Sequence, residues 1–452
     1  MLGLNPREVS NLLGAKLHGP SVSEYLDASL ASSKADSRLV ENGDLFVALP
    51  GAHSDGHDWL QAAWEKGAGA ALVSYIPEGV PKEMPVIEVE DTLLALHELA
   101  RVHLKNLNAP VVGITGSVGK TTAKDLFSHL LGGPASQVHA APASYNSEIG
   151  LPLSILSAPQ GTRRLVLEYG VNEPGEMEVL LSIAKPNHAW ITALSPAHME
   201  GMKHFDVLVH EKSFLAHAGA QAGGVWSTSR VCGLAAARGE IWSASPHLSG
   251  FRRGGAEVLS PVPGAFEVEL PQLGVCKLPV MARHEAELCA VAVDLALALG
   301  EDPKDLKQRI PNLPRPNGRL QKKEVGSWVL LDDAYNSSPT AALAAIEVLS
   351  SWPGIDFKVA VLGTMHELGN LAPLYHRTVG AEAALAGLDL LIGVGEGGRW
   401  ILEGAKSTGL ELKMEYSENA VGASGKLKEL CPEEALILLK ASRAESLEEV
   451  FA

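Results

Sequence analysis

Residues 111–122, VVGITGSVGKTT, constrain the fold more than any other segment, because an apolar strand runs directly into a glycine-rich turn. Glycines let such a turn curl so that backbone N–H groups and the start of the next helix converge on a phosphate group. Lys120 is then expected to reach the terminal phosphates and the Thr121 hydroxyl to ligate Mg²⁺. Ile114 replaces the first glycine of the strict P-loop pattern, so an ordinary strand-to-helix turn is the alternative. The Gly-Lys-Thr context favours the phosphate loop.

Two breaks divide the chain of 452 residues, a length that suits about three domains. The segment LNAP at 107–110 precedes the phosphate-loop strand, and IPNLPRPNGRL at 310–320 carries three prolines. Proline and glycine clusters of this kind separate folded units. We therefore expect domains over residues 1–108, 109–315 and 316–452.

Strands alternate with helical stretches through the second and third domains. The apolar runs VVGIT, RLVLEYG and HAWITAL belong to the second, and WVLLDD, KVAVLGTM, LDLLIGVG and ALILLK to the third. This alternation is typical of parallel sheets with crossover helices. The predicted fold class is α/β, with a small N-terminal α/β domain, a central P-loop parallel-sheet domain and a C-terminal Rossmann-like doubly wound domain.

Charge and composition narrow the function classes. A formal net charge of −16 argues against nucleic acid or an anionic membrane as the main partner. The four cysteines are scattered without a Cys-x-x-Cys pair, so neither a zinc site nor a disulfide framework is indicated. The first residues lack a signal-peptide layout, and no apolar run reaches about 18 residues. We expect a cytoplasmic protein without stable membrane insertion.

Three side chains of the central domain suit a metal or phosphate site. Glu168 ends a buried strand, His198 lies in the loop after another strand, and Lys212 follows in a helical stretch. Ligands of open α/β sheets bind at the carboxyl ends of strands, where a carboxylate suits Mg²⁺. Taken singly, His198 and Lys212 have ordinary alternatives as solvated surface groups.

The third domain has a polar cluster after its first apolar strand. Asp332 and Asp333 are placed to accept from ribose hydroxyl groups, and Tyr335 to lie against an adenine, with Asn336 in the same turn. The alternative is that Asp333 and Asn336 cap the helix that starts near Pro339.

Three cations of this domain are candidate anion ligands. Arg319 follows a proline- and glycine-rich approach that would present its guanidinium rigidly to a phosphate group. Lys440 and Arg443 come just after the last strand and suit a substrate carboxylate.

The order of these motifs resembles the Mur ligases over nearly the whole chain. The motifs are TGSVGKTT, YNSEIGLPLSIL, LEYGVNEPGEME, SPAHMEG, EKSFLA, NGRL, DDAYNSSP, LGTMHELG and KASR, preceded by DSRLVENGDLFVALPGAHSDGHDWL. Within that family, the set is most similar to the members that join D-alanyl-D-alanine to UDP-N-acetylmuramoyl-tripeptide at the expense of ATP. The resemblance implies an ATP-dependent ligase of peptidoglycan precursor synthesis, which we expect to be a monomer.

The resemblance also implies roles for individual residues. It places Glu168, His198 and Thr121 at two Mg²⁺ sites, and it makes Lys212 a carbamylated lysine whose carbamate serves as an acidic metal ligand. The implied ATP-binding residues are Thr115, Gly116, Ser117, Val118, Gly119, Lys120, Thr121, Thr122, Arg319, Asp332, Asp333, Tyr335 and Asn336. The implied substrate-binding residues are Asp36, Ser37 and Arg38 for the uridine nucleotide, with Asn146, Ser147, Lys440 and Arg443.

The chain departs from the family at Glu285 and Leu288, which stand where two asparagines are usual. The first asparagine helps to place the adenine, and an amide can donate as well as accept, whereas a carboxylate only accepts. The sequence alone therefore favours weaker adenine binding. Ser147 and Thr364 replace a second asparagine and an aspartate of two other motifs, and neither change removes a phosphate or metal ligand.

Alternative functions stay open at this point. Another Mur-type ligase is one, although the DNPR motif usual in the diaminopimelate-adding enzyme is absent. A folylpolyglutamate synthase would share the phosphate loop and the carbamylated lysine but would not need the N-terminal domain. A nucleotide-binding relative without ligase activity is the third, and a GTPase switch is disfavoured because no NKxD motif occurs.

Overall fold

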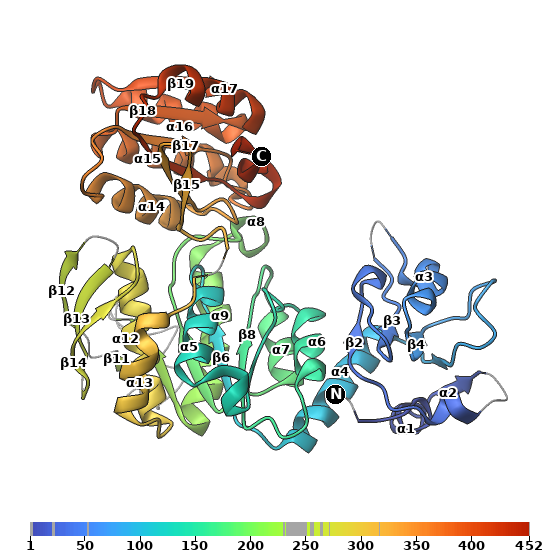
Figure 1. Ribbon diagram of the computed structural model, residues 1–452. Coiled ribbons are helices and arrows are strands. Elements are labelled where there is room, and N and C mark those ends of the chain that lie inside the picture. The colour runs from blue at the N-terminus through green and yellow to red at the C-terminus, as the bar shows by residue number, and fades with distance from the viewer. Residues whose placement is uncertain are drawn as a thin grey trace.

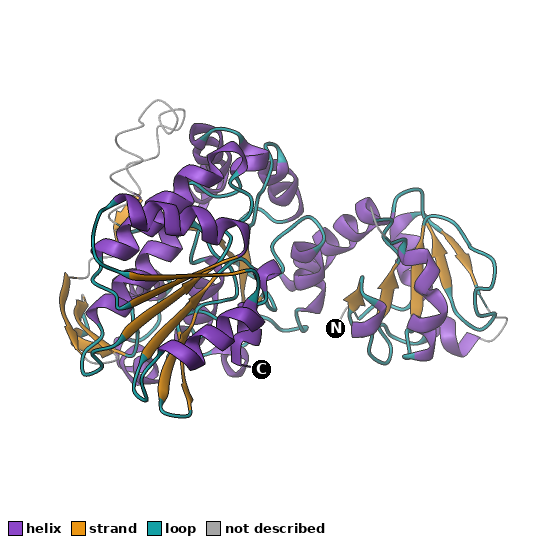
Figure 2. Ribbon diagram, turned by 90° about the horizontal axis from the view of Figure 1, so that it is seen from above, coloured by secondary structure: helices purple, strands orange, loops and turns teal. Residues whose placement is uncertain are grey.

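The computed structural model describes residues 3–19, 23–51, 54–228, 231, 251–253, 257–262, 265–270, 272–315 and 317–451. Three α/β parts follow one another along the chain, each built around its own sheet. The C-terminal part lies above the central part, and the N-terminal part projects to one side (Figure 1). Figure 2 shows the molecule from above, with the N-terminal part again extending to one side.

The N-terminal part has a five-stranded sheet in the order β1-β5-β4-β3-β2, in which only β1 runs antiparallel to its neighbour. Its strands are β1 (Lys16–His18), β2 (Ser33–Lys34), β3 (Leu45–Val47), β4 (Ala70–Val73) and β5 (Val86–Glu88). Its helices are α1 (Pro6–Leu13), α2 (Ser23–Asp27), α3 (Leu60–Glu65) and α4 (Thr92–Leu107). Asp91 caps α4, whose apolar face buries Leu96 and Leu99 and leads into the central part.

The central part has six parallel strands in the order β11-β10-β9-β6-β8-β7. They are β6 (Val111–Thr115), β7 (Val138–Ala140), β8 (Arg164–Glu168), β9 (His188–Ile191), β10 (Gly224–Ser227) and β11 (Phe251–Arg253). The helices are α5 (Lys120–Leu130), α6 (Gly150–Ser157), α7 (Glu176–Ile183), α8 (Met199–Met202), α9 (Phe205–Ala222), α12 (Arg283–Ala298) and α13 (Pro303–Arg309). Every residue of β6 is buried, as its uninterrupted apolar run predicts.

A small antiparallel sheet, β12 (Glu257–Val262), β13 (Ala265–Leu270) and β14 (Gly274–Leu278), precedes α12. None of the strands predicted from the sequence belongs to it. Val268 and Leu278 of this sheet are buried in the same apolar cluster as residues of α12 and α5. The small sheet therefore contributes to the core of the central part.

The C-terminal part has six strands in the order β15-β16-β20-β17-β18-β19, with β15 antiparallel and the rest parallel. They are β15 (Gln321–Val325), β16 (Trp328–Asp332), β17 (Lys358–Leu362), β18 (Leu390–Val394), β19 (Lys413–Ser417) and β20 (Leu436–Lys440). The helices are α14 (Pro339–Ser351), α15 (Ala372–Leu385), α16 (Gly395–Ser407) and α17 (Ala420–Leu430). Two separate apolar clusters line the two faces of this sheet, which is the doubly wound arrangement predicted from the sequence.

The predicted fold class is therefore confirmed, whereas the boundaries after residues 108 and 315 stay a prediction. Strands β9, β6 and β8 are adjacent, and so are β16, β20 and β17. Loops at the carboxyl ends of both sets carry the residues that line one shared cavity. In the part of the chain that the structure describes, none of the helices is both long enough and apolar enough to span a bilayer.

Candidate active site

The glycine-rich loop after β6 is braced by the segment that follows β9. Thr192 Oγ1 donates to the Val118 carbonyl at 2.6 Å, and Ser117 Oγ donates to the Ser195 carbonyl at 2.6 Å. Gly116 has a φ of 156°, and a Cβ there would collide with the Thr192 hydroxyl. The turn is thus closed against a neighbouring strand in a way that only glycine permits at this position.

Lys120 begins α5, immediately after Gly119 with its left-handed φ of 82°. Its Nζ donates to the Gly116 carbonyl at 2.9 Å, so the ammonium group curls back over the loop. Burial lowers the pKa of Lys120, with Glu168 acting in the opposite direction. A cation held over converging backbone N–H groups is what a polyphosphate requires.

Thr121, Glu168 and Asn146 form one buried network at the carboxyl ends of β6 and β8. The Thr121 hydroxyl donates to Glu168 Oε2 at 3.0 Å, and Asn146 Nδ2 donates to Glu168 Oε1 at 2.7 Å. Ser144 Oγ lies 3.2 Å from the Thr121 hydroxyl. Both carboxylate oxygens of Glu168 are held in place, and the side chain is 1% exposed.

Lys212 is the least satisfied polar group near the loop. It lies in α9, is fully buried, and its Nζ has no hydrogen-bond partner within the described residues. Burial lowers the pKa of Lys212 well below its ordinary value, and Lys120 adds to the effect. Because a buried polar group without a partner is costly, the position calls for a further group beside the amine.

His198 is held by a residue from the C-terminal part. Its Nδ1 lies 2.5 Å from Oε2 of Glu367, which comes from the loop after β17. Both side chains line the cavity.

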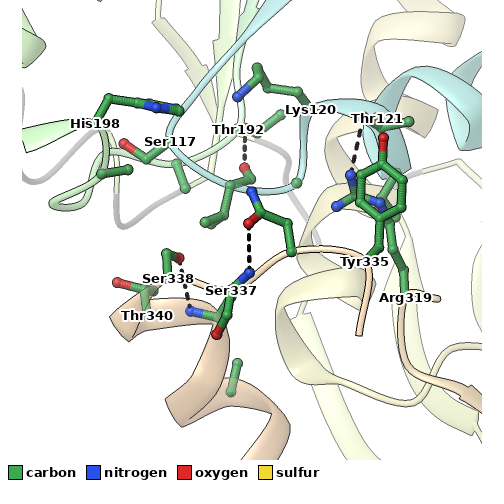
Figure 3. Close-up of a pocket in the computed structure, with 18 of the residues that line it drawn as sticks. Ser117, Lys120, Thr121, Thr192, His198, Arg319, Tyr335, Ser337, Ser338 and Thr340 are labelled. Atoms are coloured by element: carbon green, nitrogen blue, oxygen red, sulfur yellow. Dashed lines mark hydrogen bonds between the residues drawn. The ribbon is translucent and has the colours of Figure 1, made fainter. Parts of the chain in front are cut away.

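The C-terminal part presents Arg319 and Tyr335 to the phosphate loop. Arg319 Nη2 donates to the Thr121 hydroxyl at 3.4 Å, a long contact that Figure 3 marks beside Tyr335. The Arg319 guanidinium lies 4.7 Å from the centre of the Tyr335 ring, and the Tyr335 hydroxyl is 3.3 Å from Ser144 Oγ. The predicted nucleotide residues of the two domains therefore meet around Thr121.

Three predicted C-terminal ligands, Lys440, Asp332 and Asp333, are engaged within the protein. Lys440 is 2% exposed, lies 2.8 Å from the Asp333 carboxylate and donates to the Asn336 carbonyl at 2.6 Å. Burial raises the pKa of Asp333, and Lys440 opposes that shift. Asp332 pairs with Lys323 at 2.5 Å and accepts from the backbone of its own turn. These contacts shape the turn that carries Tyr335.

A cavity of about 1620 Å³ joins the two parts. Most of the predicted site residues line it: Ser117, Val118, Gly119, Lys120, Thr121, Thr122, Asn146, Ser147, Glu168, His198, Arg319, Asp333, Tyr335, Asn336, Lys440 and Arg443. Thr115, Gly116, Lys212 and Asp332 are buried and do not belong to the lining. Ser144, Thr192 and Glu367 line the cavity as well, although no role was predicted for them from the sequence.

The predicted uridine-nucleotide residues lie apart from this cavity. Asp36 caps the turn that contains Ser37, and it pairs with Arg38 at 2.7 Å. The Arg38 side chain is 85% exposed. These three residues are not among those that line the cavity, and their role in binding a uridine nucleotide stays a prediction.

Glu285, predicted beside the adenine, is already engaged. Its Oε2 accepts from the Met281 and Ala282 backbone N–H groups at 2.8 and 3.2 Å, which caps α12. Its Oε1 lies 2.9 Å from Arg315 of the segment that leads to the C-terminal part. Although Glu285 lines the cavity, its oxygens serve the helix end and the linker.

A phosphate loop that faces a doubly wound domain across one cavity defines a multidomain nucleotide-binding protein of the P-loop class. Family models of the Mur ligase middle domain, of the Mur ligase glutamate ligase domain and of the Mur ligase family catalytic domain match residues 114–225, 318–443 and 32–103. The chain belongs to the Mur ligase family.

Named relatives match between 78% and 100% of the chain. A Bacillus subtilis UDP-N-acetylmuramoyl-tripeptide--D-alanyl-D-alanine ligase is 28% identical over 462 residues, 100% of this chain and 98% of that protein. The Synechocystis ligase of the same name is 32% identical over 361 residues, 78% of this chain and 77% of its own. The crystal structure of MurF ligase from Thermotoga maritima in complex with ADP matches with a TM-score of 0.77 and 28% identity, covering 93% of this chain and 96% of that one.

Proposed function

We propose that this protein is an ATP-dependent ligase that adds D-alanyl-D-alanine to UDP-N-acetylmuramoyl-tripeptide. The main support for this proposal is that Lys120 and Thr121 lie close to Arg319 and Tyr335 around one cavity. This arrangement fits a nucleotide held between two domains. The names of these two relatives supply the substrates. The reaction would take place in the cytoplasm, where peptidoglycan precursors are made, and the enzyme would act as a monomer.

The reaction has two steps. The terminal carboxylate of the tripeptide attacks the γ-phosphorus of ATP, the bond to the β-phosphate oxygen breaks, and an acyl phosphate and ADP form. The amino group of D-alanyl-D-alanine then attacks the acyl carbon, loses a proton, and expels inorganic phosphate as the amide forms. Lys120 and Arg319 balance the charge that develops on the transferred group. The C-terminal domain excludes water, which would hydrolyse the acyl phosphate.

The residues present fit Mg²⁺. Thr121 and Glu168 bring a hydroxyl and a carboxylate within 3.0 Å of each other beside the phosphate loop, and Mg²⁺ is usually held by one or two carboxylates together with substrate phosphates. His198 at the cavity wall would serve a second ion. When bound, Mg²⁺ supplies Lewis acidity that neutralises phosphate charge.

Lys212 fits a carbamate. A neutral amine is the form that adds carbon dioxide, and burial favours the neutral form of this lysine. Carbamylation replaces the basic amine of Lys212 with an acidic group. This group could hold a cation at a buried position where the amine has no partner among the described residues.

The decisive experiment measures phosphate release from ATP by the purified protein with UDP-N-acetylmuramoyl-tripeptide, with D-alanyl-D-alanine, and with both. The proposal expects release that depends on both, with Lys120→Ala as the inactive control. Loss of one preorganised charge contact commonly lowers turnover by about a hundredfold or more. Release with a different amino acid acceptor would indicate another Mur-type ligase, and binding of ATP without any release would indicate a relative that has lost the activity.

A further inference from the structure

The loop after β17 reaches from the C-terminal domain to the turn that carries His198. Besides the contact between the two side chains at 2.5 Å, the Glu367 carbonyl accepts from the Glu200 backbone N–H at 3.2 Å. This second bond enters α8, the short helix that Figure 1 shows directly beneath the C-terminal domain. Two bonds of Glu367, one from its side chain and one from its backbone, thus join the two domains beside the cavity.

His198 and Glu367 both have a left-handed backbone conformation. His198 has a φ of 55° and Glu367 a φ of 64°, and neither is a glycine. Left-handed conformations are unfavourable for residues with a Cβ and persist where the surroundings hold them. Here His376, fully buried under the loop, accepts from the Met365 backbone N–H at 2.8 Å and so supports the approach to Glu367.

The contact assigns one nitrogen of His198 to Glu367 and leaves the other outside the contact. Oε2 of Glu367 is a carboxylate oxygen, which accepts, and it lies 2.5 Å from Nδ1 of His198. Nδ1 of His198 therefore donates in this contact, and Nε2 is the ring nitrogen that stays available to the site. A carboxylate that orients a histidine in this way commonly tunes a metal ligand.

We propose that Glu367 is a positioning residue, which fixes the His198 imidazole for the phosphate and cation site only when the C-terminal domain docks on the central domain. This inference rests on the proposed function for its turnover measurements. Glu367 and His198 are separated by 169 residues in sequence and belong to different domains. The bond between them therefore forms only where the two domains are docked.

Neighbouring charged groups do not take the place of this pair. The adjacent His366 faces Glu445 at 3.4 Å, and the Lys120 ammonium group is engaged with the Gly116 carbonyl. If Glu367 itself touched the reacting groups or the ion, its removal would act independently of His198. If it acts through His198, the two removals are not additive.

The test is a double-mutant cycle with Glu367→Ala, His198→Ala and the double variant, assayed for kcat and for the KM of ATP. We expect Glu367→Ala to lower kcat by roughly 10- to 100-fold, as for groups that orient a metal ligand. The double variant should be no slower than His198→Ala alone. Glu367→Gln, which keeps an acceptor oxygen, should recover part of the loss and guards against a folding defect in the alanine variant.

A second readout does not depend on ligation. Mn²⁺ binding in the presence of ADP, followed by electron paramagnetic resonance, should weaken by about tenfold in Glu367→Ala and to the same degree in the double variant as in His198→Ala. Glu200→Ala is the matched control, since it removes an exposed carboxylate of the same junction but keeps the backbone bond.

The outcomes separate the two proposals. A wild-type protein that binds Mn²⁺ and shows this coupling but ligates nothing would refute the proposed function and leave the role of Glu367 intact. Additive losses, unchanged behaviour of Glu367→Ala, or absence of Mn²⁺ binding by the wild type would overturn the role of Glu367.

Discussion

Lys212 shows how a single residue can conflict with its surroundings in the absence of a ligand. An amine buried in α9 without a partner among the described residues is poorly placed for packing or for a salt bridge. We expect Lys212→Ala to fold normally and to lose at least about a hundredfold in turnover, because a charge contact at the phosphate site is removed. Formate or acetate should restore part of the activity by occupying the place of the carbamate.

The measurement is steady-state phosphate release with and without the added carboxylate, after circular dichroism has established that the variant is folded. Lys185→Ala, an exposed lysine bonded to Gln221, is the control and should behave as wild type. Full activity of Lys212→Ala in buffer depleted of bicarbonate would contradict the carbamate.

Glu285 is a residue whose expected effect changes once its contacts are known. The sequence alone suggests that Glu285→Asn should improve ATP binding. In the structure, the carboxylate caps α12 and pairs with Arg315, and an asparagine is too short to keep both contacts. We expect Glu285→Asn to leave the KM for ATP unchanged and to lower the free energy of unfolding by about 1–3 kcal/mol.

Thermal unfolding and the ATP dependence of turnover, measured on the same preparation, test this expectation. Asp305→Asn on the exposed surface of α13 is a suitable control, because its contact with Arg309 is a long surface pair at 3.7 Å. A lower KM with unchanged stability would return Glu285 to the adenine site.

Residues of the site that form local motifs were predictable, and those that depend on distant partners were not. Lys120 and Thr121 follow from twelve consecutive letters, because the strand, turn and helix of a phosphate loop are contiguous. Glu367 gains its role from contact with His198, which is 169 residues away in sequence. Ser144 gains its role from Thr121 and Tyr335, which are 23 and 191 residues away. No spacing in the sequence indicates these pairs.

At the scale of elements, the buried apolar strands and their parallel pairing were predictable, but the short sheet β12 to β14 was not. Its strands alternate polar and apolar residues, as with Val268 between Glu267 and Glu269, and such short runs are easily taken for loops. It matters for the site because α12, which carries Glu285 and Leu288, packs on it.

Lys124 joins two elements of the site. Its buried Nζ, one turn after Lys120 in α5, donates to the Ala141 and Ala143 carbonyls at 2.6 Å each. The segment it fastens leads to Asn146, which holds Glu168. We expect Lys124→Met, similar in length but without donors, to lower the midpoint of thermal unfolding and to reduce kcat at temperatures where the variant is fully folded.

The stability loss should be about 1–3 kcal/mol for each carbonyl left without a partner. Differential scanning calorimetry and turnover at 20 °C below the midpoint check the two effects, with Lys105→Met on the exposed surface of α4 as the control. Wild-type kcat in a destabilised Lys124→Met would mean that the lysine serves the fold without positioning the 141–146 segment.

At the scale of the whole molecule, buried and half-buried histidines link folding to pH. His97 and His103 lie in α4 between the N-terminal and central parts, His139 in the central part and His376 in the C-terminal part. Burial lowers the pKa of each of these four rings. In each case a ring nitrogen is bonded to a backbone carbonyl, as for His103 and the Ala158 carbonyl at 2.9 Å.

The sign of the pH dependence follows from these shifts. A histidine whose folded pKa lies below its unfolded value of 6.5 binds a proton more readily in the unfolded chain. Its stabilising contribution is complete above 6.5 and is lost as the pH falls below that value. Each ring contributes at most about 1.4 kcal/mol per pH unit. The unfolding temperature should therefore fall between pH 7.5 and pH 5.5.

His376→Gln tests which ring is responsible in the C-terminal domain. The ring donates to the Ala372 carbonyl at 2.7 Å and accepts from Met365 at 2.8 Å, so protonation would break the second bond under the loop that carries Glu367. Glutamine can donate and accept but does not titrate. Calorimetric scans from pH 7.5 to 5.5 should show a smaller shift for the C-terminal transition in this variant than in wild type. An equal shift, or an unfolding temperature that rises as the pH falls, would contradict the link, because protonation of His376 would then cost the folded state nothing.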